Sequence, residues 1–192
     1  METSDNDLVL ILKCAGTACN IGCKYCAEAR KKQVSLTNAN TVTLDDIEKL
    51  MDLTASVDNI TVLFHGGEPL LLPIGYYDDI IKKWRQQRND VYFGFQTNAT
   101  LIDDKWIDFF DSYREIVGIS ISLDGSASAN SNRVRKDGKS TFHNVIHALE
   151  ELERRNLTVG MISTLTQAAM GQEHELFKLI SQFNNIRFLK LN

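Results

Sequence analysis

The chain has 192 residues and a formal net charge of −4, and 43% of its residues are hydrophobic. This length suits one domain with a core of its own. The mildly acidic balance does not favour nucleic acid as the main partner, because phosphate binding requires clustered Lys and Arg. No apolar run approaches the roughly 20 residues that a membrane helix needs, and the polar start is unlike a signal peptide. We therefore expect a cytoplasmic protein.

Strand and helix signals alternate along the whole chain. In chain order the predicted elements are a strand over 8–12, a helix over 43–57, a strand over 60–64, a helix over 75–88, a strand over 91–95, a helix over 103–113, a strand over 116–123, a helix over 141–156, a strand over 157–165, a helix over 173–183 and a strand over 186–191. Residues 31–43 are polar and irregular. Thr43 and Thr141 are the predicted N-caps of their helices.

The predicted strands are apolar and rich in β-branched residues, which is typical of strands covered on both faces. Their alternation with helices indicates right-handed βαβ units and a parallel sheet. We therefore predict an α/β fold, either an open barrel or an open doubly wound sheet, that ends at the sixth strand. No helix follows that strand, so either the chain is a fragment or a partner chain covers the strand.

Residues suited to chemistry follow four of the predicted strands. They are Cys19, Cys23 and Cys26 after the first strand, Gly66, Gly67 and Glu68 after the second, Gln96, Thr97 and Asn98 after the third, and Ser122 and Asp124 at the end of the fourth. Ligands of parallel α/β folds bind at the carboxyl ends of the strands. We therefore expect these residues to converge on one site.

Three cysteines, Cys19, Cys23 and Cys26, have the spacing C-x3-C-x2-C. Soft thiolates favour iron–sulfur clusters, and three of them would leave one iron of a [4Fe–4S] cubane open to a small molecule. Zinc is the alternative, but it commonly takes a second cysteine pair, which this chain lacks, and His65 could serve as a fourth ligand only if it points into the site. Cys14 is predicted to be a buried strand residue.

Other polar residues allow two interpretations each. Gly66 and Gly67 permit close approach of a ligand, and the Glu68 carboxylate could then bind an amine of that ligand. Alternatively, these residues form a simple turn. Arg133 and Arg135 could each grip a carboxylate or lie solvated in a loop. Tyr25 could stack on an adenine or shield a cluster, and Asp124 is predicted to belong to a turn.

The cysteine motif, with Tyr25 before its last cysteine, resembles the hallmark of the radical S-adenosylmethionine (SAM) superfamily. Segments 63–70, 96–101, 117–125 and 130–141 are similar to consecutive strand-end motifs of its peptide-modifying and sulfatase-maturing branch. The resemblance covers nearly the whole chain. It implies a partial (β/α)6 open barrel of parallel strands.

The resemblance also implies a role for each matching residue. The [4Fe–4S] cluster would be held by Cys19, Cys23 and Cys26, and its open iron would chelate SAM. The SAM amino group would be bound by Gly66, Gly67 and Glu68, and its carboxylate or ribose by Ser122 and Arg133. The adenine would lie by Tyr25, and the same cofactor site would include Thr97 and Asn98. Reductive cleavage of SAM would give a 5′-deoxyadenosyl radical that abstracts hydrogen from a peptide side chain.

Within this branch the chain looks most like the cyclophane-forming maturases, which crosslink ribosomally synthesised peptides. An anaerobic sulfatase maturase forming formylglycine is one alternative, and a truncated, non-catalytic cluster-binding module is another. A flavodoxin- or ferredoxin-type protein would supply electrons.

The chain departs from the family pattern in two places. Ala99 replaces a usual glycine, and no cysteine follows Cys26. Residues 1–192 are therefore expected to be the radical SAM core domain without the C-terminal SPASM region and its auxiliary clusters, and no catalytic base is assigned.

Overall fold

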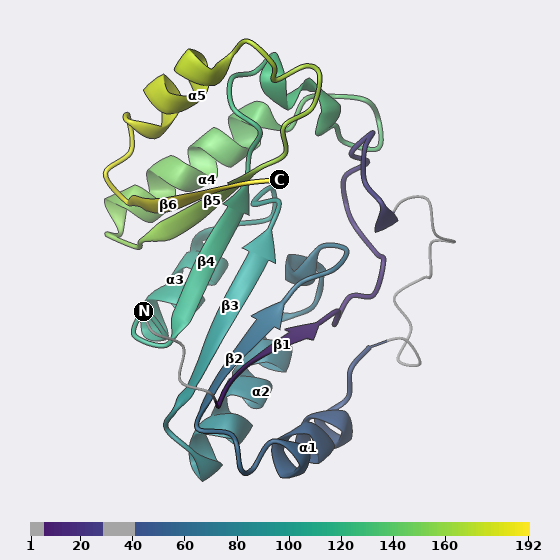
Figure 1. Ribbon diagram of the computed structural model, residues 1–192, viewed down its shortest axis with the longest axis vertical. Helices are drawn as coiled ribbons and strands as arrows, with labels where there is room; N and C mark the ends of the chain where they lie inside the picture. Colours follow the sequence, from purple (N-terminus) through teal and green to yellow (C-terminus); the bar gives the residue numbers. More distant parts are fainter. Residues whose placement is uncertain (1–5, 29–40) are drawn as a thin grey trace.

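A computed structural model describes residues 6–28 and 41–192 of the chain. Six parallel strands form one sheet in the order β1-β2-β3-β4-β5-β6 (Figure 1). The strands are β1 (Asp7–Leu12), β2 (Asn59–Phe64), β3 (Val91–Thr97), β4 (Val117–Ser122), β5 (Val159–Ser163) and β6 (Ile186–Leu191). The helices are α1 (Leu44–Leu53), α2 (Ile74–Gln87), α3 (Asp104–Ser112), α4 (Phe142–Arg154) and α5 (Glu173–Ile180), with short 3-10 helices η3 (Pro69–Leu71) and η4 (Ala129–Asn132). The predicted α/β architecture is confirmed; the irregular segment predicted over 31–43 lies mostly outside the described residues.

The two predicted helix caps have different outcomes. Thr43 caps α1 as expected, because its Oγ1 accepts a hydrogen bond from the Asp46 backbone N–H at 3.2 Å while the Asp46 carboxylate accepts one from the Thr43 N–H. Thr141 is the N-cap residue of α4 as predicted, but its side chain makes no cap bond to the helix. Its hydroxyl instead donates to the Arg133 carbonyl at 2.7 Å, so it holds the loop that carries Arg133.

The sheet is covered more fully on one face than on the other, so the prediction of strands covered on both faces is wrong for most of it. In β2, Ile60, Val62 and Phe64 are fully buried, whereas Thr61 and Leu63 between them are partly exposed. Helices α1, α2 and α3 lie behind the sheet in Figure 1, and the opposite face is open. Only β5 is buried along its whole length. Apolar residues at open-face positions hid this alternation in the sequence.

An aromatic cluster fixes the carboxyl halves of β2 and β3 against the helices. Phe64 ends β2 and packs edge-on against Tyr77 of α2, with ring centroids 4.8 Å apart. Phe95 of β3 contacts Phe110 of α3 at 5.3 Å and also packs near Trp106. Burial of each such side chain contributes roughly 1.5–3 kcal/mol. The loops that follow these strands therefore start from fixed positions.

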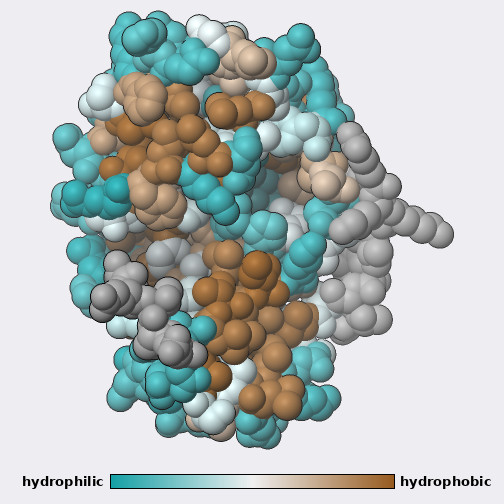
Figure 2. Space-filling view, in the orientation of Figure 1, coloured by the Kyte–Doolittle hydropathy of each residue, from teal (hydrophilic) through white to brown (hydrophobic). Residues whose placement is uncertain are grey.

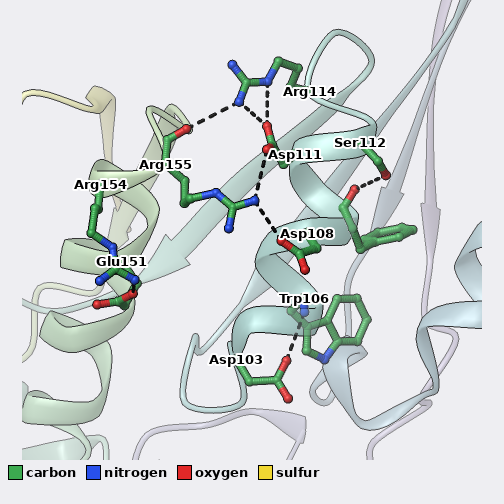
Figure 3. A network of polar contacts seen from close by, with 10 residues as sticks. Asp103, Trp106, Asp108, Asp111, Ser112, Arg114, Glu151, Arg154 and Arg155 are labelled. Carbon is green, nitrogen blue, oxygen red and sulfur yellow. Dashed lines mark hydrogen bonds and ion pairs between the residues drawn. The ribbon is translucent and has the colours of Figure 1, made fainter.

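Ion pairs join α3 to the residue that follows α4 (Figure 3). Arg155, directly after α4, donates to the carboxylates of Asp108 at 2.8 Å and Asp111 at 3.2 Å. Arg114 also pairs with Asp111. Exposed ion pairs contribute only about 0–1 kcal/mol each to stability. The network connects two helices, and none of its residues lines the strand-end cavity.

Two apolar areas are exposed on the face shown in Figure 2. One lies over β1 to β3, where Val9 and Ile11 are exposed, and the other lies over α5 and β6, where Phe177 is 60% and Phe188 is 53% exposed. Among the described residues, no helix combines the length and the apolar character needed to cross a bilayer.

Candidate functional site

The strand-end residues converge on one cavity of about 380 Å³, a size within the usual range for small-molecule sites. Its lining includes all eleven residues predicted to bind the metal or the cofactor: Cys19, Cys23, Cys26, Tyr25, Gly66, Gly67, Glu68, Thr97, Asn98, Ser122 and Arg133. Gln96 and His65 line it too. The structure therefore brings the predicted residues together, and the contact that each one would make with a cofactor stays a prediction.

The three motif cysteines are free thiols that are partly buried at the cavity. Burial raises the pKa of Cys23 to about 11, although the nearby Arg133 opposes the shift, and burial also raises the pKa of Cys19. Binding of a metal must therefore displace thiol protons. Within residues 6–28 and 41–192, no three His, Cys, Asp or Glu side chains are arranged to hold one metal ion. Three soft thiols that share one cavity suit an iron–sulfur cluster, in which each thiolate would bind its own iron.

Cys14 is buried as predicted, with 1% of its surface exposed, but it lies two residues beyond β1 and outside the cavity lining. His65 does reach the cavity, and burial lowers its pKa, so the imidazole is neutral near pH 7. Its Nδ1 is buried and has no hydrogen-bond partner among the residues described.

Backbone hydrogen bonds join the loop after β2 to the cysteine loop. The Gly67 N–H donates to the Gly16 carbonyl at 2.9 Å, and the Glu68 N–H donates to the Ala18 carbonyl at 2.7 Å. A Cβ added at Gly67 would lie 1.9 Å from the Ala18 oxygen. Gly66 has a φ of +87°, which favours glycine. The two glycines are thus required for the close contact between these loops.

Glu68 is 1% exposed, and both of its carboxylate oxygens accept hydrogen bonds. Oε1 accepts from the Thr97 hydroxyl at 2.6 Å and from the Leu70 N–H at 3.0 Å, while Oε2 accepts from the Asn98 N–H at 2.8 Å. Burial raises the pKa of Glu68, and these hydrogen bonds oppose the rise. In the structure, Glu68 and Thr97 therefore brace the loops after β2 and β3 against each other.

Asn98 connects the loop after β3 to a cysteine. Its Nδ2 donates to Asn20 Oδ1 at 2.9 Å and lies 3.7 Å from Cys19 Sγ, within hydrogen-bond range of sulfur. Asn20 in turn donates to the Thr100 hydroxyl at 2.8 Å. Hydrogen bonds to cysteine sulfur orient a ligand and change the potential of the cluster it holds. Asn98 is thus placed to act through Cys19.

Sequence reasoning placed Asp124 at the site and in a turn but missed its contacts: Asp124 does not line the cavity and instead holds two residues that do. Its side chain is fully buried, and it accepts hydrogen bonds from Tyr25 Oη at 2.7 Å, from Arg133 Nε at 2.9 Å and from the Thr164 N–H at 2.9 Å. The Arg133 guanidinium also lies over the Tyr25 ring, 5.5 Å from its centroid. The available signal was an acidic residue directly after a buried apolar strand, beside Ser122.

The protonation states of Tyr25 and Arg133 depend on their burial and on their contacts with Asp124. Burial disfavours the charged form of Arg133 and is the largest single effect, but attraction to Asp124 together with smaller contributions from Tyr25 and Cys23 outweighs it and raises the pKa of the guanidinium. Burial, with a contribution from the Asp124 carboxylate, raises the pKa of Tyr25. The phenol therefore stays protonated and donates to Asp124, while Arg133 keeps its positive charge beside the cavity.

A parallel sheet with three free cysteines in the loop after its first strand is typical of a cluster-binding α/β protein. The family profile described as "Radical SAM superfamily" matches residues 15–174, and the chain belongs to this superfamily. Its cofactors are therefore those of the family, a [4Fe–4S] cluster and SAM. The donor set fits this group, since three soft thiols share one cavity.

The curated relatives include anaerobic sulfatase-maturating enzymes. A serine-type enzyme of Bacteroides thetaiotaomicron is 30% identical over 158 residues, which are 78% of this chain and 37% of the relative. A cysteine-type enzyme of Clostridium novyi is 25% identical over 190 residues, which are 95% of this chain and 50% of the relative. The chain thus spans at most about half the length of these relatives.

Solved structures share the fold. A structure described as native anSMEcpe with bound AdoMet and Cp18Cys peptide has a TM-score of 0.82 at 22% identity, with 96% of this chain and 50% of that chain covered. Streptococcus suis SuiB bound to precursor peptide SuiA has a TM-score of 0.67 at 18% identity, with 97% and 38% covered. These likenesses confirm the predicted barrel-type architecture of parallel strands.

Proposed function

We propose that residues 1–192 form the radical SAM core domain of an enzyme that modifies a peptide side chain. The observation that carries this proposal is the convergence on one cavity of three free cysteines after β1 and of residues at the ends of β2, β3 and β4. This arrangement supports cofactor binding at the site, because a purely structural metal site would be closed by protein ligands.

The residues of the chain have separate tasks in this proposal. Cys19, Cys23 and Cys26 hold the cluster, and the loop Gly66–Glu68 presents its backbone to the SAM amino group. Ser122 and Arg133 bind the SAM carboxylate or ribose, Tyr25 lies by the adenine, and Thr97 and Asn98 complete the cofactor pocket. When bound and reduced, the cofactors supply a 5′-deoxyadenosyl radical that abstracts hydrogen from the substrate. The protein contributes placement and exclusion of water.

The relatives support a peptide substrate. The curated ones are named for the maturation of sulfatases, and the solved structures of anSMEcpe and SuiB each contain a bound peptide. We propose crosslinking of a ribosomally synthesised peptide, and formylglycine formation has equal support from the relatives. Mass spectrometry on an aromatic-rich peptide and on a sulfatase-derived peptide separates the two. A crosslinked product loses two hydrogens and does not react with hydrazide, whereas formylglycine carries an aldehyde that does.

The first prediction tests SAM cleavage itself. After anaerobic reconstitution and reduction with dithionite, Cys23→Ala should form no 5′-deoxyadenosine, because the cluster has lost a ligand. Cys14→Ala should cleave SAM nearly as well as the parent chain, because Cys14 lies outside the cavity lining. Chromatography of 5′-deoxyadenosine and iron analysis check both variants.

Two outcomes would count against this proposal. If the parent chain itself forms no more 5′-deoxyadenosine than a cluster-free control, the non-catalytic binding module is the better description. If both variants fail equally while retaining their fold by circular dichroism, Cys14 belongs to the site.

A further inference from the structure

His65 lines the cavity and has no task in the proposed function. It directly follows β2, and its backbone N–H donates to the Leu12 carbonyl at 3.0 Å, so the end of β1 holds this position of the chain. Within residues 6–28 and 41–192 its Nδ1 has no hydrogen-bond partner, although that nitrogen is buried. Because such partners set the tautomer of a neutral histidine, no contact at Nδ1 dictates which ring nitrogen carries the proton.

Two carboxylates also line the cavity, and both are engaged within the protein. Glu28 pairs with Lys13 at 2.7 Å. Glu68 accepts hydrogen bonds at both of its oxygens and braces the loops after β2 and β3. A carboxylate that took a proton from a substrate would weaken these charge-assisted contacts. Both side chains are therefore poorly suited to accept a proton during a reaction.

Tyr25 and Arg133 are the other ionisable side chains of the cavity apart from the motif cysteines, and both hold their protons. The Tyr25 hydroxyl donates to Asp124 at 2.7 Å, and Arg133 pairs with the same carboxylate as a cation. The three thiols are the expected cluster ligands. Among the cavity side chains that the structure describes, His65 is thus the one left free to accept a proton.

The surroundings of His65 keep its imidazole neutral. Burial is the main cause of its lowered pKa; the positive charges of Lys13 and Lys190 lower the pKa further, and the Glu28 carboxylate opposes them. Lys13 follows β1, Lys190 lies in β6 and Glu28 follows the motif cysteines. A neutral imidazole accepts protons effectively near pH 7, because its pKa lies close to that pH.

Both reactions considered for the chain remove two hydrogens from a peptide. One C–H bond breaks when a hydrogen atom passes to the 5′-deoxyadenosyl radical. The second hydrogen leaves as a proton, from an aromatic ring carbon in a crosslink or from a thiol or hydroxyl on the way to formylglycine. One electron leaves with it for an oxidised iron–sulfur centre. A new C–C bond, or a C=S or C=O bond, then replaces the two bonds to hydrogen, and the proton requires an acceptor.

We propose that His65 is this acceptor: its imidazole takes the proton that the peptide loses after the hydrogen atom has been abstracted. The imidazole becomes an imidazolium ion and later releases the proton to solvent. This inference rests on the proposed function, because it requires a peptide radical in the cavity. It holds for either reaction, since each of them releases one proton.

The test compares two histidine variants. His65→Gln keeps a polar side chain but removes the group that can take up a proton. His147→Gln is the matched control, because His147 is exposed on α4 and lies outside the cavity lining. Reconstituted proteins react anaerobically with SAM, dithionite and either the sulfatase-derived or the aromatic-rich peptide, deuterated at the carbon that loses the hydrogen atom. We measure iron content, the Kd for peptide, deuterium in 5′-deoxyadenosine, and modified peptide formed per 5′-deoxyadenosine.

His65→Gln should keep its iron, its Kd for peptide and the transfer of deuterium to 5′-deoxyadenosine, because the cluster and the peptide radical still form. Modified peptide per 5′-deoxyadenosine should fall by about 10²-fold or more, the usual contribution of a general base. His147→Gln should match the parent chain in every measurement.

The parent chain gives a second test that needs no substitution. Modified peptide per 5′-deoxyadenosine should fall as the pH is lowered through the pKa of His65, since the imidazolium ion cannot accept a proton. Burial places this fall below the usual histidine pKa of about 6.5. Deuterium transfer should not follow the same curve, because abstraction of the hydrogen atom needs no base.

Three results would overturn the inference. Loss of iron in His65→Gln would assign His65 to the metal site, and a raised Kd with an unchanged yield per 5′-deoxyadenosine would make it a binding residue only. A yield in the parent chain that is independent of pH would exclude a histidine base. If the parent chain cleaves SAM but transfers no deuterium from either peptide, the proposed function itself fails, and this outcome is distinct from the other three.

Discussion

Asp124 joins two of the residues predicted to bind SAM. Its buried carboxylate holds Tyr25 through one oxygen and Arg133 through the other. Neither residue is adjacent to Asp124 in the sequence, and both reach the cavity. Asp124 is therefore a positioning residue. It fixes the positions of the Tyr25 ring and the Arg133 guanidinium and need not contact the cofactor itself.

This arrangement predicts a large effect of Asp124→Asn. The substitution removes the buried counter-charge of Arg133, so the free energy of unfolding should fall by about 3–5 kcal/mol. SAM should also bind more weakly, because Tyr25 and Arg133 lose their common anchor. Thermal unfolding and SAM binding by calorimetry on reconstituted protein measure the two effects.

Asp137→Asn is the matched control for that experiment. It removes an exposed carboxylate paired with Lys139, and such pairs contribute at most about 1 kcal/mol. If Asp124→Asn lowers stability but leaves the Kd for SAM unchanged, its role is structural only.

The loops after β1, β2 and β3 form one interlocked unit at the scale of the elements. The cysteine loop accepts hydrogen bonds from the N–H groups of Gly67 and Glu68, and Glu68 accepts hydrogen bonds from the loop after β3. This connection explains how the buried Glu68 carboxylate is stabilised without an ion pair to any of the residues that the structure describes. Its hydrogen bonds replace the water lost on burial.

Gly67→Ala should separate two of these loops. The new Cβ would meet the Ala18 backbone oxygen at 1.9 Å, so the backbone must move and the hydrogen bond from Glu68 to Ala18 should be lost. We expect a lower melting temperature and reduced iron content after reconstitution, measured by calorimetry and iron analysis.

Gly75→Ala provides the comparison in α2, where an added Cβ meets nothing within 4 Å. Alanine favours a helix over glycine by roughly 0.5–1 kcal/mol, so this variant should be slightly more stable and should load iron normally. Normal iron content in Gly67→Ala would show that the close approach of the two loops is dispensable.

At the scale of the whole molecule, the helix side of the sheet is well packed, whereas the surface over α5 and β6 exposes large apolar side chains (Figure 2). Exposed apolar areas of this kind favour association. The expectation that a partner chain covers β6 stays a prediction, and this surface gives it a physical basis.

The 192-residue chain should therefore associate with itself as its concentration rises. Phe177→Gln should weaken this association, since burial of one large apolar side chain contributes roughly 1.5–3 kcal/mol. Leu53→Gln, at an 80% exposed position on α1, should have little effect. Sedimentation velocity compares the three proteins, and equal weakening by both substitutions would mean that no particular surface is responsible.

The order of the elements and the predicted cluster ligands can be inferred from the amino-acid sequence alone. Strand and helix alternate visibly because their hydrophobic patterns are local, and this order largely dictates a parallel sheet. The cysteine spacing is local too, so three thiolates in one loop could be identified without a structure. The convergence of Glu68, Asn98 and Ser122 followed from the rule that strand carboxyl ends share one edge.

The contacts between these residues, in contrast, depend on how the chain folds in three dimensions. Hydrogen bonds join Glu68 to Thr97, 29 residues apart, and Asp124 to Tyr25, 99 residues apart. Another joins Thr141 to Arg133, 8 residues apart. Ala99 adopts a φ of 61°, and its N–H donates to the Thr97 hydroxyl. Such pairings depend on which loops meet in space, and no local pattern encodes that contact. The open face of the sheet was missed for a related reason, because apolar residues on an uncovered face resemble those of a core.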